Sequence, residues 1–389
     1  MSLNKKVKVL FVAPTPPPYT GLEVISELFL RSDIKKEFRI IHIRSNLNKT
    51  NQSRGKLGLY NTSRFMLLCL KVFIFEFIYR PKILYSILSE NFTGFMRSSF
   101  IVLIGKLFRN RVVMHLHGAN FRNFYFYSNR FLQIYVRFIL QHADRIIVLG
   151  KSLRTQFSGI CALDKIRVVP NGIPPAGEGY FAKCFEQKDR EGKCTVLFLG
   201  LLSQAKGFND MIKAMPLVLE AERGVRFIFA GERVKVERNI LFSYEGKMLE
   251  REDVEALLPE LENKYPQEIC FSSVVEGKEK EKLFMGSDIF VLPSYSEGLP
   301  ISIIEAMSYG LPIITSPVGA LPDYLREGDN CFFVPPGDYV KLADSLIRLI
   351  RDPALRFEIG KRNYEYSRTQ LSIEHSAKVL SEVIAQVSQ

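Results

Sequence analysis

The 389-residue chain is too long for one ordinary hydrophobic core, so its length predicts two or three domains. Hydrophobic residues make up 47% and charged residues 24%, which is typical of a soluble globular protein. The six cysteines form no CxxC pair. This excludes a disulfide framework and a cysteine zinc site, and it favours a reducing cytoplasm.

The net charge of +12 is unevenly distributed along the chain. Up to Pro170 there are 27 Lys or Arg and 8 Asp or Glu, whereas from Asn171 onward there are 26 and 33. A basic half joined to an acidic half indicates that only one half faces an anionic partner. That partner is a nucleic acid or a membrane surface, and none of the usual nucleic-acid-binding motifs is present.

Apolar runs of strand length alternate with helical patterns, which predicts βαβ units and parallel sheets. The run at 7–13 is too short for a signal peptide and precedes a proline-rich turn, so we expect it to be the first strand. Further strands of the first half are expected at 38–43, 83–87, 112–115, 145–149 and 166–169. Helices are expected at 22–30, 62–79, 95–107 and 129–141.

The second half begins after a break at 169–172 and a segment rich in Pro, Gly and charge at 173–193. Its strands are expected at 195–200, 225–231, 269–275, 288–292, 311–315 and 331–334. The charged stretch 232–267 is expected to be a loop with an exposed helix over 244–264. No stretch is long and uncharged enough to span a bilayer; residues 65–79 come closest but contain Lys71 and Glu76.

These patterns predict an α/β protein with two doubly wound Rossmann-like domains that face each other across a cleft, where such folds bind ligands. The expected parts are an N-terminal domain at 1–172, a linker at 173–193, a C-terminal domain at 194–365, and a C-terminal helix at 366–389. We expect this helix to pack back on the N-terminal domain.

The strongest functional motif begins at Pro293, which ends a predicted strand. Gly298 permits a tight backbone turn, and Pro300 suits the first turn of a helix. Glu297 is therefore expected in a loop at the carboxyl edge of the sheet, with Glu305 about one and a half turns into the helix. Two carboxylates so placed accept hydrogen bonds from sugar hydroxyls. A helix cap followed by a solvated glutamate would give the same spacing.

In its context, this motif resembles the C-terminal signature of the family 4 glycosyltransferases, which are retaining enzymes with the two-domain GT-B fold. The residues that carry the resemblance are 290–294, 297–300, 305–307, 310–314 and Gly319, together with 197–200, 206–207 and 168–173. The resemblance covers nearly the whole chain, and its C-terminal motifs are specific in combination.

The resemblance implies that Glu297 binds hydroxyls of the transferred sugar and that Glu305 binds the ribose of the nucleotide. Backbone amides from Leu299 to Ile301 would face the diphosphate, as a helix N-terminus also favours physically. The implied donor site comprises Gly21, Gly200, Lys206, Glu297, Gly298, Leu299, Pro300, Ile301 and Glu305.

Lys206 stands in the loop after the first strand of the second domain. A lysine there is able to neutralise a diphosphate leaving group without a metal, although a surface lysine in a turn is the simpler alternative. The family usually has an arginine after the glycine that ends this strand, but here Gly200 is followed by Leu201. Another basic residue would have to replace that cation.

The first domain has two weaker candidates. Gly21 precedes the first helix where the family commonly has two glycines, and Thr20 replaces the other; a plain turn explains the pattern equally well. His115 and His117 end a strand, and Gly118 permits a sharp turn. By the resemblance, His117 would orient the sugar and the β-phosphate, with His115 as the alternative that packs inward.

Residues 61–141 are rich in Phe, Tyr and Arg. A mixture of basic and aromatic side chains is typical of segments that lie at a membrane interface. We expect this half to dock on the cytoplasmic face of an anionic membrane as a peripheral protein. The alternative is a basic domain with a buried aromatic core.

Together these features predict a retaining glycosyltransferase that moves a sugar from a nucleotide diphosphate sugar, UDP-linked, to a hydroxyl of a lipid-linked or glycan acceptor. His117, Glu297 and Lys206 are its expected catalytic residues. Neither a cofactor nor a metal is expected, since no carboxylate or histidine cluster has ligand spacing. Two alternatives stay open: a catalytically weak GT-B partner in a glycan assembly complex, and a sugar-nucleotide epimerase.

Overall fold

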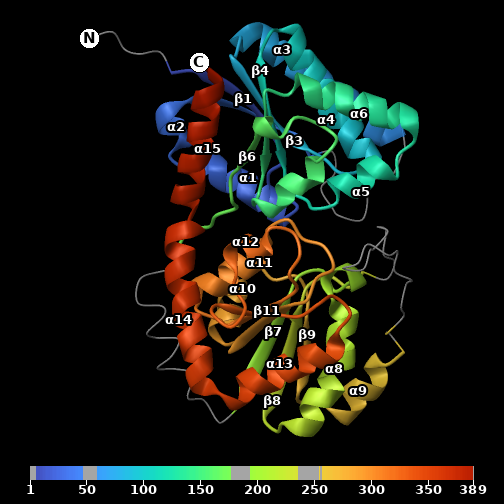
Figure 1. The fold of residues 1–389 in the computed structure, drawn as a ribbon, viewed down its shortest axis with the longest axis vertical. Helices are drawn as coiled ribbons and strands as arrows, with labels where there is room; N and C mark the ends of the chain where they lie inside the picture. The colour runs from blue at the N-terminus through green and yellow to red at the C-terminus, as the bar shows by residue number, and fades with distance from the viewer. Residues whose placement is uncertain (1–5, 47–58, 177–192, 235–253, 255, 389) are drawn as a thin grey trace. The chain divides into compact units, whose positions relative to one another are not determined.

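The computed structural model describes residues 6–46, 59–176, 193–234, 254 and 256–388. The chain divides into two compact units, of which the first comprises residues 1–173 and 371–389 and the second residues 174–370 (Figure 1). Most of the linker expected at 173–193 lies outside the described residues. So does most of the helix expected over 244–264, because only residue 254 and residues 256–264 of it are described.

The first unit is built on a parallel six-stranded sheet with the order β2-β1-β3-β4-β5-β6. Its strands are β1 (Lys8–Ala13), β2 (Arg39–Arg44), β3 (Ile83–Leu88), β4 (Arg111–Leu116), β5 (Arg145–Val148) and β6 (Ile166–Val168). From Val9 to Ala13 no side chain of β1 is more than 1% exposed. A central parallel strand is covered on both faces, which explains its unbroken apolar run.

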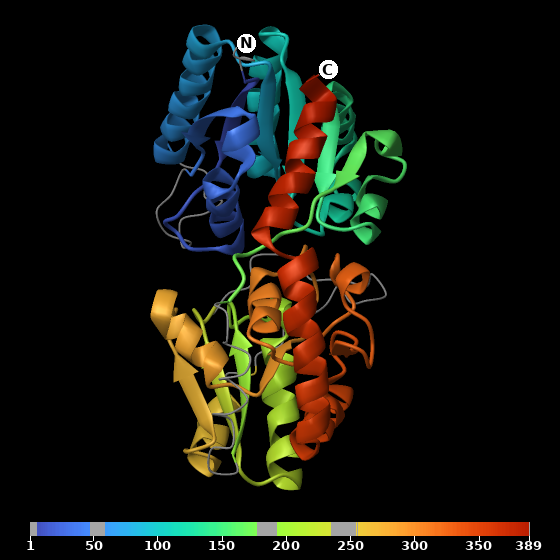
Figure 2. The ribbon, with the colours of Figure 1, turned by 90° about the vertical axis from the view of Figure 1, so that its left-hand side faces the viewer.

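Helices cover both faces of this first sheet (Figures 1 and 2). They are α1 (Gly21–Arg31), α2 (Ile34–Glu37), α3 (Leu59–Tyr79), α4 (Phe92–Leu107), α5 (Phe121–Phe126), α6 (Arg130–His142) and α15 (Ile373–Ser388). α3, α4 and α6 lie side by side on one face, and α1 and α15 lie on the other. This division follows from the right-handedness of strand–helix–strand connections. α1 leads from β1 to a strand on one side of it, whereas α3, α4 and α6 lead to strands on the other side, so the two groups of helices lie on opposite faces. Two short 3-10 helices, at Ser152–Phe157 and Leu163–Lys165, lie between β5 and β6.

The second unit repeats the plan with the strand order β12-β11-β10-β7-β8-β9. Its strands are β7 (Cys194–Leu199), β8 (Val225–Ala230), β9 (Ile269–Ser272), β10 (Ile289–Leu292), β11 (Ile313–Thr315) and β12 (Cys331–Phe333). Its helices are α8 (Phe208–Ala221), α9 (Leu258–Lys264), α10 (Gly277–Met285), α11 (Ile301–Ser308), α12 (Leu321–Tyr324), α13 (Tyr339–Arg351) and α14 (Pro353–Gln370). The prediction of two parallel α/β sheets is confirmed, with a strand at each expected position.

The chain returns to the first unit at Leu371. The segment 366–389, expected as one helix, contains the end of α14 in the second unit and α15 in the first. Within the first unit α15 packs on α1, α2, β3 and β4. No helix in the described part of the chain is long and apolar enough to cross a membrane.

Candidate functional site

The loop from β10 to α11 places Glu297 at the carboxyl edge of the second sheet. β10 ends at Leu292, α11 begins at Ile301, and Pro300 is the N-cap of the helix. The Glu297 side chain is only 8% exposed, and Ser294 Oγ donates a hydrogen bond to Glu297 Oε1 at 2.8 Å. This hydrogen bond fixes the carboxylate within the loop.

Two glycines hold this loop by close backbone contact. Gly207 has a φ of +76°, and a Cβ there would lie 2.1 Å from the carbonyl oxygen of Pro293. Gly319 has a φ of +61°, and a Cβ there would lie 1.7 Å from the carbonyl oxygen of Glu297. The adjacent Ala320 N–H donates to Gly298 O at 2.8 Å. Any side chain at either glycine would displace the loop that carries Glu297.

Lys206 and Glu297, predicted separately from distant segments, form an ion pair. Lys206 Nζ lies 2.6 Å from Glu297 Oε1, and the lysine side chain is 28% exposed. Tyr295 N–H also donates to Ala205 O at 3.0 Å, which ties the lysine loop to the glutamate loop. The pair therefore places a cation and a carboxylate together at one end of the sheet.

Glu305 has a lysine partner that sequence reasoning missed. Lys280 Nζ, on α10, lies 2.5 Å from Glu305 Oε1. Burial raises the pKa of Glu305, and the charge and hydrogen bond of Lys280 oppose that rise. The sequence 278–282 reads KEKEK, a charge run typical of a solvated helix face, so nothing in it distinguishes Lys280 from its neighbours.

The amino end of α11 supplies hydrogen-bond donors directly after the Glu297 loop. The first intrahelical bond runs from Ile304 N–H to Pro300 O at 3.4 Å, so the N–H groups of Ile301, Ser302 and Ile303 precede it. Pro300 itself has no N–H, so within 299–301 only Leu299 and Ile301 have a backbone N–H to offer. Helix N-terminal N–H groups and the helix dipole favour an anion at this position.

The two residues directly after β7, Gly200 and Leu201, are uncharged. Gly200 N–H donates to Ala230 O at 3.0 Å, which continues the pairing of β7 with β8. The next residue, Leu201, is 41% exposed. Arg233 is joined to Leu202 by a backbone bridge, but its guanidinium lies over the Phe271 ring at 4.2 Å. Arg233 therefore does not stand in for the missing arginine here.

In the first unit, Gly21 is the first residue of α1 and Thr20 is its N-cap. The Thr20 hydroxyl bonds the carboxylate of Glu23 instead of a backbone N–H of the helix. Glu23 is 2% exposed, and sequence reasoning did not single it out. An acidic residue in the first turn of a helix is common, so nothing in the sequence indicates that this carboxylate is buried.

The two histidines after β4 stack with a ring-centroid distance of 3.9 Å. His115 packs inward and shares a 2.6 Å hydrogen bond between its Nδ1 and the Tyr85 hydroxyl. Neither ring nitrogen of His117 has a hydrogen-bond partner within the part of the chain that the structure describes. Burial lowers the pKa of His117 to about 3, and the nearby Asn171 side chain opposes this shift. His117 is therefore expected to be neutral at physiological pH, with both ring nitrogens buried and the Asn171 side chain nearby.

Gly118 lies against a carboxylate that was also missed. A Cβ at Gly118 would lie 2.2 Å from Glu90 Oε2, and the same oxygen accepts a hydrogen bond from Asn120 N–H at 2.7 Å. Glu90 follows β3 and His117 follows β4, so the two neighbouring strands bring them to the same edge of the first sheet. The sharp turn expected at Gly118 thus has a steric cause.

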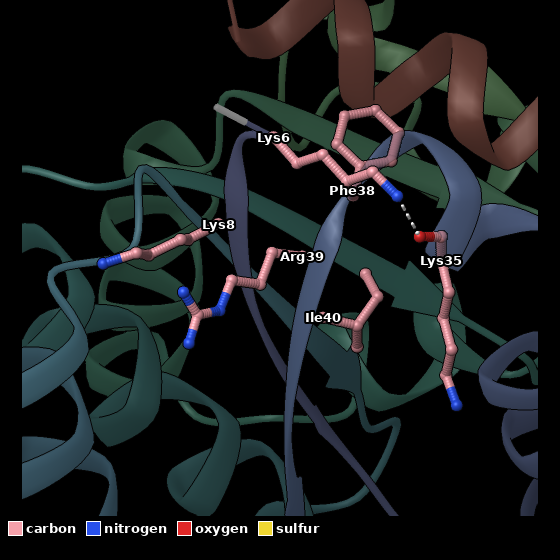
Figure 3. Close-up of a pocket in the computed structure, with 6 residues that line it drawn as sticks. All are labelled: Lys6, Lys8, Lys35, Phe38, Arg39 and Ile40. Carbon is pink, nitrogen blue, oxygen red and sulfur yellow. Dashed lines mark hydrogen bonds between the residues drawn. The ribbon is translucent and has the colours of Figure 1, made fainter. Parts of the chain in front are cut away.

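A hollow of about 440 Å³ lies at the opposite, amino edge of the first sheet (Figure 3). It is lined by Lys6, Lys8, Lys35, Phe38, Arg39 and Ile40. Lys6 Nζ donates to Lys35 O at 3.0 Å, and Lys8 Nζ donates to Tyr79 O at 2.7 Å. Figure 3 shows the cationic ends of Lys8 and Arg39 pointing away from that of Lys35. These cations do not converge on one point, so the hollow is a basic surface feature to which we assign no ligand.

The structure thus assembles the predicted residues in two groups. Lys206, Glu297, the start of α11 and Glu305 belong to the second unit, whereas Gly21 and His117 belong to the first. Residues 182–366 match the family model of the glycosyl transferases group 1. This segment, a little under half of the chain, is therefore similar to that family.

Relatives and solved structures show the same similarity. An uncharacterized glycosyltransferase of Methanocaldococcus jannaschii is 28% identical over 225 residues, which cover 54% of this chain and 52% of that protein. The phosphatidyl-myo-inositol mannosyltransferase of Mycobacterium leprae is 30% identical over 197 residues, covering 48% and 45%. The chain therefore spans about half the length of the curated relatives that it matches. The crystal structure of Anabaena HepE in complex with UDP superimposes with a TM-score of 0.71 at 16% identity, covering 98% of this chain and 100% of that one. The fold is GT-B.

Proposed function

We propose that this chain is a retaining glycosyltransferase that transfers a sugar from a UDP-linked donor to an acceptor hydroxyl. The observation that carries the proposal is the Lys206–Glu297 pair directly before the amino end of α11. A cation and helix N–H groups suit a diphosphate, and a buried carboxylate suits sugar hydroxyls. The match of residues 182–366 to the family model and the fold shared with HepE, whose structure contains UDP, support this donor class.

In the proposed reaction the bond between the anomeric carbon and the diphosphate oxygen breaks, and the electron pair leaves with the diphosphate. The acceptor oxygen bonds to the same face of the anomeric carbon, and its proton passes to an oxygen of the departing diphosphate. Lys206 and the N–H groups of Ile301, Ser302 and Ile303 stabilise the charge that develops on the leaving group. Glu297 and the neutral His117 ring hold the sugar. Before the donor arrives Lys206 is held by Glu297, so donor binding exchanges one internal ion pair for contacts with both parts of the donor.

We also propose that the acceptor is a lipid-linked or glycan hydroxyl used in the synthesis of a cell-surface polysaccharide or glycolipid, reached at the cytoplasmic face of an anionic membrane. The excess of 27 Lys or Arg over 8 Asp or Glu up to Pro170 supports an anionic partner for the first unit. The Mycobacterium leprae relative, whose name specifies a phosphatidyl-myo-inositol acceptor, supports a lipid-linked substrate.

A thermal-shift screen across UDP-, GDP- and ADP-sugars tests the donor part of the proposal. A donor at 100 times its Kd stabilises the folded protein by about 2.7 kcal/mol, which raises Tm measurably. We expect one UDP-sugar to do so and to be hydrolysed slowly to UDP. Glu297→Ala should abolish that hydrolysis, whereas Glu279→Ala, at an exposed position on α10, should leave it unchanged. If no nucleotide sugar raises Tm, the enzyme proposal is wrong.

A second candidate function rests on Leu201. Its exposed apolar side chain stands where the family usually has an arginine, and the nearby Arg233 lies over the Phe271 ring instead. A protein that has only the lysine of the two cations expected beside the leaving group could serve as a catalytically weak partner in a glycan assembly complex. Donor binding without measurable UDP release, restored by Leu201→Arg, would favour this candidate over an active transferase.

A further inference from the structure

The outward face of α3 is mostly apolar from Met66 to Ile78. Met66, Leu67, Leu70, Phe73, Ile74, Phe77 and Ile78 are all at least 41% exposed. Their spacing follows the helical repeat, so they form one continuous stripe. The inward face carries Leu68, Val72 and Glu76, which are at most 6% exposed. The helix therefore turns its larger apolar surface away from the core of its own unit.

The stripe continues across the neighbouring helices, which lie side by side with α3 (Figures 1 and 2). Phe65 packs edge-on against Phe100 of α4 at 5.5 Å, and Tyr135 of α6 donates to Ser99 of α4 at 2.9 Å. Exposed apolar side chains on these two helices are Phe100, Leu107, Phe131, Ile134 and Phe138. We call this surface, together with the α3 stripe, the α3–α4–α6 face. A contiguous apolar patch of this kind indicates an interaction surface.

The charge of the same region indicates what covers it. Residues 59–142 contain 11 Lys or Arg and only two acids, Glu76 and Glu90. Glu76 is fully buried and accepts a hydrogen bond from Asn110 Nδ2 at 2.6 Å. Glu90 lies in the loop after β3, where it accepts from Asn120 N–H. The face is thus apolar and aromatic, surrounded by cations, and without an exposed carboxylate on α3, α4 or α6.

We propose that the α3–α4–α6 face inserts into the boundary between headgroups and acyl chains of an anionic membrane. Apolar side chains with a basic surround suit this interface, where the cations meet anionic headgroups and the rings enter the acyl region. A second copy of the chain fits the face less well, because a symmetric contact would oppose two surfaces of the same positive charge. This inference rests on the proposed membrane docking and deepens it: insertion of named side chains, and not charge alone, holds the protein on the bilayer.

The absence of tryptophan from the sequence allows a direct test on the full chain. A single tryptophan is placed at Phe77 or Phe131, which are 63% and 86% exposed, or at Leu217 of α8 in the second unit as a control. The three proteins are mixed with phosphatidylglycerol–phosphatidylcholine vesicles that carry brominated acyl chains. We expect the emission of Phe77→Trp and Phe131→Trp to move to shorter wavelength and to be quenched, and Leu217→Trp to show neither change.

A variant that weakens binding measures how much one side chain of the face contributes to membrane affinity. Phe77→Asp should lower the vesicle partition coefficient about tenfold, as expected for losing one buried aromatic side chain, while Leu217→Asp leaves it unchanged. Both positions are exposed, and an unchanged Tm and an unchanged UDP-sugar thermal shift verify the fold.

Three results would overturn the inference. If the Phe77→Trp and Phe131→Trp proteins sediment with the vesicles but their tryptophans emit as in solution, another surface docks and this face does not. A dimer that Phe77→Asp converts to a monomer would assign the face to a second copy. If no anionic vesicles are bound, the face and the membrane proposal both fail, whereas hydrolysis of a UDP-sugar still decides the transferase proposal independently.

Discussion

The candidate donor site of the second unit contains charges that are paired inside the protein, Lys206 with Glu297 and Lys280 with Glu305. In the first unit, cations outnumber carboxylates by 27 to 8 up to Pro170, so most of them have no internal carboxylate to meet. Internal pairs hold a loop in position before a ligand arrives. Unpaired surface cations act at longer range and on an extended partner. The two units are therefore suited to different anions: a small one in a built site, and a large anionic surface.

The largest effect is expected from removing the cation of the donor site. Lys206→Met deletes the positive charge next to the leaving group and leaves the buried Glu297 without its ion-pair partner. We expect kcat for donor hydrolysis or transfer to fall about 10²- to 10³-fold, as for the loss of one transition-state donor, and Tm to decrease. Lys206→Arg should recover part of the rate. Lys361→Met, at an exposed position on α14, is the control. A Lys206→Met enzyme within tenfold of the parent would contradict the assigned role.

The next effect tests whether the loop around Glu297 must be held by close backbone packing. Gly319→Ala would place a Cβ only 1.7 Å from the carbonyl oxygen of Glu297, so the loop has to move. Gly328 has a similar φ of +73° but no atom within 4 Å of its would-be Cβ. Gly328→Ala therefore reports the backbone strain alone, of about 1 kcal/mol, and Gly319→Ala reports the strain plus the clash.

Chemical denaturation and UDP-sugar binding measure this pair of variants. We expect Gly319→Ala to lose donor affinity and at least twice as much unfolding free energy as Gly328→Ala. Equal losses of stability with unchanged donor binding would mean that the loop tolerates displacement.

The parallel sheets were predictable because buried parallel strands are continuous apolar runs, such as 83–87 and 112–115. Strand ends were predicted less well. β9 was expected to run to residue 275 but ends at Ser272, where polar residues interrupt the apolar run. The short helix α5 was missed, since its six residues carry an aromatic pattern that fits an interfacial loop equally well.

The sequence predicted which residues belong to the candidate site, but not which of them contact one another. Glu297 and Gly319 were named from their motif, yet only the structure shows that Gly319 packs on the carbonyl of Glu297. Lys206 and Glu297 are 91 positions apart, and no spacing rule relates them. Glu90 and Lys280 were missed because each lies in an ordinary local sequence and acts through a residue from another strand or helix.

A buried carboxyl of the first unit, Glu76, differs from Glu297 and Glu305 in that its hydrogen-bond partner is an amide and not a lysine. Burial raises the pKa of Glu76 to about 7 from the usual 4.5, and the Asn110 hydrogen bond only partly opposes this. Below pH 4.5 the carboxyl is protonated in both the folded and the unfolded state. Between 4.5 and 7 the unfolded state loses the proton first, so the free energy of unfolding falls as pH rises, by up to about 3 kcal/mol.

Glu76→Gln keeps an acceptor for Asn110 and removes the ionisation. We expect its stability to exceed that of the parent at pH 8 and to match it near pH 4.5, as measured by urea unfolding across this range. Glu37→Gln changes an exposed carboxyl in the same unit and should leave the pH dependence intact. Parallel pH profiles for Glu76→Gln and the parent would show that Glu76 does not titrate in this window.

The smallest effect concerns single surface cations, and it tests the two-unit comparison directly. Lys71 is an exposed lysine on α3 whose Nζ lies 5.6 Å from the centre of the Phe75 ring, within the proposed membrane face. A lysine near an anionic leaflet contributes about 1 kcal/mol, so Lys71→Gln should weaken binding to phosphatidylglycerol vesicles about fivefold. Lys361→Gln removes the same charge from the second unit and should have no effect. Raising the salt concentration should shrink the difference between the two variants, because screening weakens the charge contribution while the inserted side chains remain. If both substitutions weaken vesicle binding equally, net charge alone drives adsorption, and the proposal that only the first unit binds the membrane is wrong.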